Sequence, residues 1–183
     1  MDNNNTENRK RINIKKSTTD LAVMGILTAL CIVIAMFLTI RPSNSIKITL
    51  TFIPIVIAAY LYGPVGAGTV AGLADLLGYV FNSGGGMLFL PITFSEIAIG
   101  VVFGLLLHNK RSLPRIILGV AFAQLIVSTF ITPIWLNKLY HIDYLTNLYL
   151  RIPQIAIMIV IEMIVIPPML KLLEKLKKSK VIN

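Results

Sequence analysis

The chain has 183 residues, of which 56% are hydrophobic and 14% charged, and its mean hydropathy is +0.80. About one quarter of the residues in a soluble domain are charged, so this composition excludes a soluble protein and indicates an integral membrane protein. The net charge of +9 does not indicate a nucleic-acid partner, because the basic residues flank apolar segments instead of covering a polar face. The single cysteine, Cys31, lies inside an apolar segment and fits a buried thiol.

Six apolar segments follow one another along the chain, and a bilayer core requires about 20 helical residues for each crossing. They are residues 21–40, 48–62, 64–81, 87–107, 116–135 and 152–170. The second and third are separated only by the turn Tyr62-Gly63-Pro64. We expect an all-α integral membrane protein whose six-transmembrane-helix bundle occupies residues 21–172, with a basic N-terminal segment at 1–20 and a basic tail at 173–183.

The distribution of lysine and arginine predicts the orientation of this bundle. Six crossings place both termini on one side, and thirteen of the seventeen basic residues fall there. Because basic residues accumulate on the cytoplasmic side, both termini are expected to be cytoplasmic. The exceptions lie in the first and last outer loops, at 41–47 and 136–151, and are Arg41, Lys47, Lys138 and Arg151. They are either ordinary solvated loop charges or ligands for an anion.

A glycine-rich stretch, YGPVGAGTVAGLADLLGYV at 62–80, has the glycine spacing of a phosphate-binding loop. Such a loop requires a lysine directly after its second glycine, and Thr69 occupies that position. As a membrane helix, the stretch instead presents Gly68 and Gly72 four residues apart, a spacing that lets helices approach closely. Asp75 lies on or beside this flank and should face the bundle, as a helix clamp or as a ligand acceptor.

The first apolar segment also carries small residues on one face, namely Ala22, Gly25 and Ala29. This face can pack against a helix of the same chain or dock another membrane subunit, and the spacing alone favours neither.

Catalytic and metal-binding motifs are absent, so neither an enzyme nor a metal or cofactor site is expected. His108 and His141 lie in loops on opposite faces, and no H-x-x-x-H, C-x-x-C or G-x-S-x-G motif occurs. Three carboxylates within the apolar segments, Asp75, Glu96 and Glu162, could form a proton relay. A proton-coupled small-molecule carrier is therefore one functional alternative.

The segment TFIPIVIAAYLYGPVGAGTVAGLADLLGYVF resembles the second and third helices of the substrate-binding S components of energy-coupling factor (ECF) vitamin transporters. The resemblance extends over nearly the whole chain after the basic N-terminus. Within that superfamily the chain is most similar to the folate-specific branch, through FLTIRPSNSIKITLTFIPI at 37–55, TPIWLNKLY and LYLRIPQ. Other vitamins, such as riboflavin, biotin or pantothenate, are the alternatives within the superfamily.

This resemblance implies a six-helix protein of a bacterial cell membrane that captures its vitamin from outside and has no ATPase of its own. Its implied partners are membrane lipid, a coupling transmembrane subunit and two cytoplasmic ATPases that drive toppling and release of substrate inside. The family docks its coupling subunit on the small face of the first helix, which here corresponds to Ala22, Gly25 and Ala29.

Folate recognition would divide the site residues by chemistry. The glutamate dianion of folate matches the basic residues Arg41, Lys47 and Arg151, because arginine can grip a carboxylate with two hydrogen bonds. The donor and acceptor edge of the pterin suits Asp75 or Asn147. Its flat ring suits an aromatic wall, for which the outer side offers Phe89, Trp135, Tyr140 and Tyr149.

Overall fold

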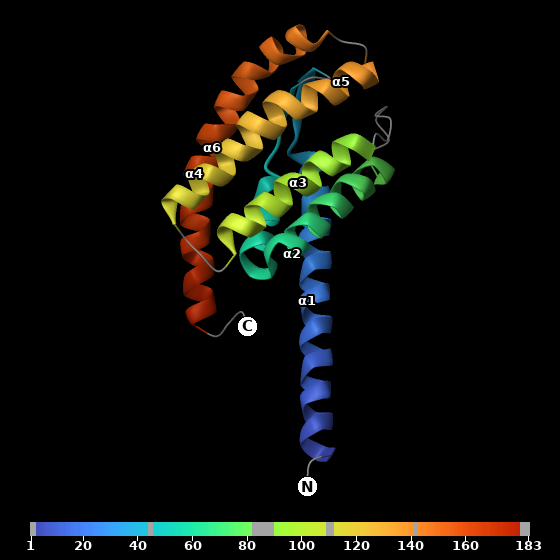
Figure 1. The fold of residues 1–183 in the computed structure, drawn as a ribbon, viewed down its shortest axis with the longest axis vertical. Helices are drawn as coiled ribbons and strands as arrows, with labels where there is room; N and C mark the ends of the chain where they lie inside the picture. The colour runs from blue at the N-terminus through green and yellow to red at the C-terminus, as the bar shows by residue number, and fades with distance from the viewer. Residues whose placement is uncertain (1–2, 44–45, 82–89, 109–111, 141–142, 180–183) are drawn as a thin grey trace.

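The computed structural model describes residues 3–43, 46–81, 90–108, 112–140 and 143–179. This part of the chain is helical apart from one short hairpin, and five of its helices are long and apolar enough to cross a membrane. Figure 1 shows the helices packed side by side in the upper part of the view, with the start of α1 and the end of α6 both pointing downward.

The first helix, α1 (Asn3–Phe37), begins well before the predicted start at Leu21. Residues 3–24 contain neither glycine nor proline, and their lysines and arginines favour a helix, so nothing in the sequence stops it earlier. Its N-terminal half extends away from the other helices as an isolated rod (Figure 1). The basic segment 1–20 is therefore continuous with the first membrane helix from Asn3 onward.

A hairpin replaces the predicted irregular loop between the first two apolar segments. Strands β1 (Ile40–Ser43) and β2 (Ile46–Ile48) pair antiparallel, with Ile40 opposite Ile48. The β-branched isoleucines of both strands favour extended backbone, which explains the departure from a purely helical chain.

Helix α2 (Phe52–Phe81) contains the predicted break at the Gly-Pro turn. Gly63 has φ 72° and ψ −159°, and it separates two helical segments. A residue with a side chain would be strained at this φ, and Pro64 cannot donate the amide that a continuous helix needs. The predicted turn is confirmed, although the helix before it begins at Phe52 because Ile48 belongs to β2.

Glycines bring the second segment of α2 into close contact with α3 (Leu90–Leu107). A Cβ on Gly72 would lie 2.7 Å from the Ile97 side chain, and one on Gly104 would lie 2.3 Å from Cα of Pro64. The expectation that small residues on α2 permit close helix approach is confirmed, and α3 is the partner.

The fifth predicted segment, 116–135, is longer and less regular than expected. It comprises α4 (Leu113–Ala121), the π-helix η1 (Phe122–Ile131) and α5 (Thr132–Tyr140), which follow one another without a break. Threonine hydroxyls bond to carbonyls five residues earlier in η1, since Thr129 donates to Gln124 O at 2.8 Å and Thr132 to Val127 O at 3.0 Å. Wide turns of this kind occur often at functional sites.

The prediction of an outer loop at 136–151 is wrong for most of that range. Helix α5 continues to Tyr140, and α6 (Tyr144–Lys178) begins only four residues later. Asp143 caps α6, because its Oδ2 accepts hydrogen bonds from the amides of Leu145 at 3.1 Å and Thr146 at 3.4 Å. Arg151 therefore lies inside a helix, not in a loop.

Candidate functional site

Five of the predicted ligand-binding side chains belong to the described part of the structure, namely Lys47, Asp75, Trp135, Tyr149 and Arg151. Phe89 and the side chains of Arg41, Tyr140 and Asn147 lie outside it, and their roles stay predictions. Tyr149 is 70% exposed on α6.

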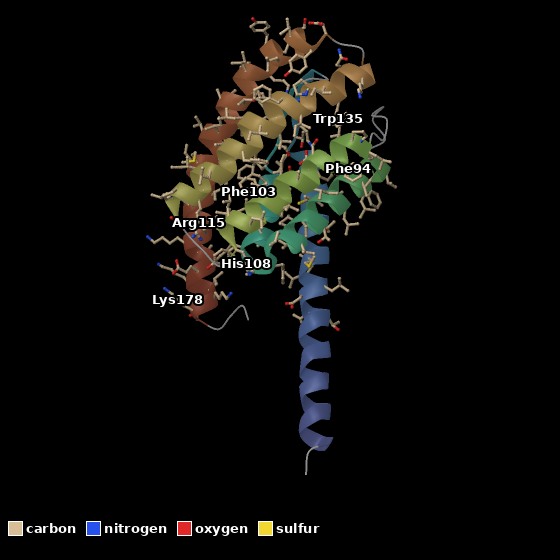
Figure 2. All side chains as sticks on the ribbon, in the orientation of Figure 1. Phe94, Phe103, His108, Arg115, Trp135 and Lys178 are labelled. Carbon is tan, nitrogen blue, oxygen red and sulfur yellow. The ribbon has the colours of Figure 1, made fainter. Side chains whose placement is uncertain are left out.

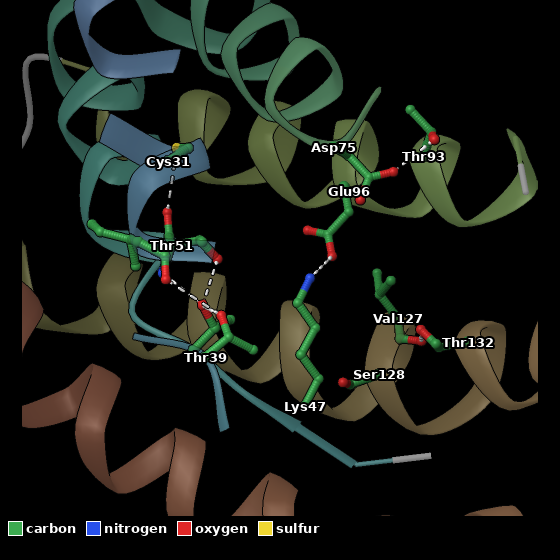
Figure 3. Close-up of polar contacts among 12 residues, drawn as sticks. Cys31, Thr39, Lys47, Thr51, Asp75, Thr93, Glu96, Val127, Ser128 and Thr132 are labelled. Carbon is green, nitrogen blue, oxygen red and sulfur yellow. Dashed lines mark hydrogen bonds and ion pairs between the residues drawn. The ribbon is translucent and has the colours of Figure 1, made fainter. Parts of the chain in front are cut away.

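Lys47 projects from the hairpin toward α3. Its Nζ lies 3.8 Å from Oε1 of Glu96, and both side chains are partly exposed (Figure 3). The lysine is thus held by an acid, and the acid was expected only as a member of a proton relay. The pair joins β2 to the bundle at a place that solvent still reaches.

Asp75 accepts a hydrogen bond from Thr93, with Oγ1 and Oδ2 2.7 Å apart (Figure 3). This bond links α2 to α3, as expected for a carboxylate that faces the bundle. Asp75, Lys47 and Arg151 all act electrostatically on Glu96, so these four charged side chains form one cluster. We refer to Lys47, Asp75, Glu96 and Arg151 as the charged cluster.

Gln154 of α6 fastens the hairpin to the bundle. Its side-chain amide accepts from the Lys47 backbone N–H at 3.1 Å and donates to the Lys47 carbonyl at 2.8 Å. A single side chain therefore satisfies both backbone groups of Lys47, as a neighbouring strand would. Gln154 is 5% exposed, so these bonds are shielded from competing water.

Of the two positively charged members of the charged cluster, Arg151 is the more buried, with 6% of its surface exposed. Its Nη2 donates to Oγ of Ser128 in η1 at 3.0 Å. Its buried Nε has no hydrogen-bond partner within the described ranges. A buried guanidinium with a donor to spare is suited to bind a carboxylate.

Trp135 lies on α5, at the end of the molecule opposite Arg115 and Lys178 (Figure 2). The Lys138 ammonium lies 5.3 Å from the centre of its ring, within the range of a cation–π contact. This indole can form part of an aromatic wall, and the Lys138 ammonium lies over its ring.

The small face of α1 is exposed at all three positions, Ala22, Gly25 and Ala29. A Cβ added to Gly25 would meet nothing within 4 Å. Packing against the other described helices therefore does not explain the small residues on this face.

The charged cluster and its supports can recognise a ligand but are not arranged for metal binding. The described residues include no group of three or more His, Cys, Asp or Glu that could hold a metal ion. Two cations, two carboxylates and the hydroxyls of Thr93 and Ser128 instead suit an organic ligand that bears both an anionic group and a donor and acceptor edge.

Comparison with known proteins identifies the family. A family model described as the S component of an ECF-type riboflavin transporter matches residues 15–175. The chain belongs to this family of S components. The S component is therefore an integral membrane protein and a transport subunit, as its apolar helices also indicate.

Two relatives are each described as the folate transporter FolT. The one from Clostridium novyi is 29% identical to this S component over 163 residues, which are 88% of this chain and 94% of the relative. The one from Leuconostoc mesenteroides is 26% identical over 129 residues, covering 69% and 68% of the two chains.

Solved structures agree with the fold. A crystal structure of FolT bound with folic acid has a TM-score of 0.74 and 26% identity, covering 80% of this S component and 89% of that chain. The structure of the S component of a bacterial ECF transporter has a TM-score of 0.57 at 23% identity, with coverage of 91% and 99%. The second match carries information on the fold alone.

Sequence reasoning missed four side chains that support the site of this S component, namely Thr93, Gln154 and Ser128, and Glu96 in its role as partner of Lys47. Gln154 follows Arg151 by three residues, so helical spacing could have placed both on one face of α6. Thr93 and Ser128 carry no comparable signal, because a single hydroxyl in an apolar helix is equally able to bond its own backbone.

Proposed function

We propose that this S component captures folate on the outer side of the cell membrane for ATP-driven uptake. The observation that carries the proposal is the charged cluster, in which the buried Arg151 lies in the same electrostatic environment as Glu96 and Asp75. The FolT relatives and the structural match to FolT with folic acid support the same ligand.

Folate matches this cluster at both of its ends. Its glutamate carries two carboxylates, for which Arg151 and Lys47 supply charge, with Arg41 as a further candidate. Its pterin presents an N–H and an amino group side by side. A carboxylate such as that of Asp75 or Glu96 can accept a hydrogen bond from each of them. Trp135, Phe89 and Tyr140 are the proposed aromatic neighbours, and Asn147 a second reader of the pterin edge.

The proposed topology has six membrane crossings with both termini in the cytoplasm. We assign one crossing to each of the two helical segments that Gly63 separates in α2, which would raise the five long apolar helices to six crossings. The start of α1 and the end of α6 both point toward the lower part of the view (Figure 1), and Arg115 and Lys178 lie toward the same side of the bundle (Figure 2). The concentration of basic residues at this end supports its assignment to the cytoplasm.

The proposed partners are a coupling transmembrane subunit and two cytoplasmic ATPases. The exposed small face of α1 offers a surface on which another helix can pack closely, so we assign the coupling subunit to Ala22, Gly25 and Ala29. ATP hydrolysis by the partners would drive release of folate inside, and the S component itself performs no chemistry.

Binding to the purified full chain tests the vitamin. We expect folate to quench the fluorescence of Trp135, the single tryptophan, and to bind tightly in calorimetry, whereas riboflavin, biotin and pantothenate do not. Riboflavin is the critical competitor because the matching family model names it, and it lacks a carboxylate for Arg151. Binding of riboflavin without folate would overturn the assignment, and folate uptake into vesicles that lack the ATPases, driven by a pH gradient, would favour a carrier.

A further inference from the structure

A second polar contact between η1 and α6 involves no residue of the charged cluster. Gln124 Nε2 donates to Oε1 of Glu162 at 2.6 Å. The two residues are 7% and 2% exposed, on helices long and apolar enough to cross the membrane. Neither the remaining oxygen of Gln124, Oε1, nor that of Glu162, Oε2, has a hydrogen-bond partner among the described residues.

The two unpartnered oxygens are complementary only if one of them carries a proton. An amide offers one donor and one acceptor, and a protonated carboxylic acid offers the same pair. An amide and a protonated acid that face each other can close a ring with two hydrogen bonds: here the observed one from Nε2 to Oε1 of Glu162, and a second from a protonated Oε2 to Oε1 of Gln124. Rotating the amide by 180° leaves the requirement unchanged, because two oxygens would then meet at 2.6 Å.

The surroundings of Glu162 also favour the neutral acid. The π-helix η1 carries no ionisable side chain, and the charge that acts on Glu162 is that of Glu96 on α3, which repels a second anion. Arg151 lies on the same face of α6 but three turns away, and Lys47 is paired with Glu96. An ionised carboxylate buried in this way, with no cation beside it among the described residues, is strongly unfavourable.

We propose that Glu162 and Gln124 form a proton-binding site, in which Glu162 takes a proton from water and the neutral acid closes a two-bond ring with the Gln124 amide. The ring joins η1 to α6 at a second level, beyond the contact between Ser128 and Arg151. It holds its proton as part of the structure, which differs from a proton relay, where the carboxylate must release it in each cycle.

Infrared spectroscopy of the full-length protein tests the protonation state directly. The difference spectrum between the wild type and Glu162→Gln at neutral pH should show loss of the C=O stretch of a protonated carboxyl group. The matched control is Glu174→Gln on the same helix, an acid 2.9 Å from the Lys178 ammonium, which should lose ionised carboxylate bands. Loss of ionised carboxylate bands from Glu162→Gln would overturn the proposal.

Thermal unfolding of a variant set gives a second, independent readout. Glu162→Gln retains both bonds without a proton. It should match the wild-type melting temperature at acidic pH, below the ordinary glutamate value of about 4.3, where the wild-type acid is protonated in the folded and the unfolded chain. It should increasingly exceed the wild type as the pH rises to neutral, because the folded wild type must then keep a proton that the unfolded chain releases. Glu162→Leu and Gln124→Leu should each melt lower because each leaves one buried polar group unpaired, and the double leucine variant should recover part of that loss. A Glu162→Gln variant that melts well below the wild type at neutral pH would contradict a neutral acid.

Discussion

Arg151 combines burial, a single hydroxyl partner and a spare donor in a membrane-spanning helix. We predict that Arg151→Ala weakens folate binding by about 2 to 4 kcal/mol, or about 30-fold to 900-fold in Kd, because a ligand carboxylate would lose its buried partner. Arg151→Lys should recover only part of the affinity, since an ammonium lacks the two-pronged geometry. Titration calorimetry measures both variants.

The control for this experiment is Arg115→Ala, which removes an arginine from the opposite end of the molecule (Figure 2). It should leave folate affinity unchanged. Equal affinities of Arg151→Ala and Arg115→Ala would show that Arg151 carries no ligand contact.

Gln154 provides a second prediction at the level of a single residue. Gln154→Ala removes both bonds to the Lys47 backbone, and at about 1 kcal/mol per bond it should lower folate affinity by about 5-fold to 30-fold. Gln154→Glu keeps the acceptor for the Lys47 amide but cannot donate to the Lys47 carbonyl, so its loss of folate affinity should be comparable. Hydrogen exchange of the Lys47 amide should accelerate in Gln154→Ala, even without folate, and much less in Gln154→Glu, which keeps the acceptor for that amide.

That exchange measurement tests the contact between Gln154 and the Lys47 backbone separately from the assignment of the hairpin to the folate site. Unchanged hydrogen exchange at the Lys47 amide in Gln154→Ala would refute this contact, whatever the folate affinity of the variant. Faster exchange with unchanged folate affinity would support the contact and show that the hairpin does not contribute to folate binding.

At the scale of elements, the packing of α2 on α3 depends on positions that have no room for a methyl group. Gly104→Ala would place Cβ 2.3 Å from Cα of Pro64, and this contact is with backbone that cannot rotate away. We predict a destabilisation of about 1 to 3 kcal/mol, seen as a lower melting temperature. Gly78→Ala, on α2 but with nothing within 4 Å, is the matched control and should be neutral or slightly stabilising.

The site itself is assembled between elements and not within any one of them. Lys47 comes from β2, Asp75 from α2, Glu96 from α3 and Arg151 from α6, while η1 contributes Ser128. The π-helical geometry widens the helix that carries Ser128, and the same segment supplies Gln124 to Glu162. Displacement of η1 would therefore change both contacts with α6 together.

For the whole molecule, the exposed small face of α1 predicts a separation of binding from transport. Gly25→Leu adds a bulky side chain where the monomer has open space, so folate affinity and stability should be unchanged. In the complex with the coupling subunit and ATPases, the same variant should lose uptake, because the added side chain blocks close helix approach. Uptake into reconstituted vesicles, compared with calorimetry, measures the two effects.

Gly78→Leu is the matched control for that experiment, since Gly78 also has open space around a Cβ but lies on α2. It should retain both binding and uptake. A parallel loss of binding and uptake in Gly25→Leu would contradict the assignment of this face to docking.

Much of the architecture follows from local sequence. Hydropathy over about 20 residues identifies the membrane segments, and the Gly63-Pro64 pair identifies the break within α2, because both depend on properties of neighbouring residues. The same local reasoning missed where helices start and end. Segments 3–20 and 144–151 are compatible with a helix as well as a loop, and only continuation of the adjoining helix decides between them.

By itself, the sequence determined that this is a membrane protein with glycines that allow tight helix contact and with charged residues such as Asp75 and Glu162 inside apolar segments. Only the tertiary structure decided which groups meet: Lys47 with Glu96, Gln154 with the Lys47 backbone, and Gln124 with Glu162. The physical reason is that apolarity and helical spacing belong to one segment, whereas a buried polar group is satisfied by a partner from a distant segment. That partner is fixed by how the helices pack.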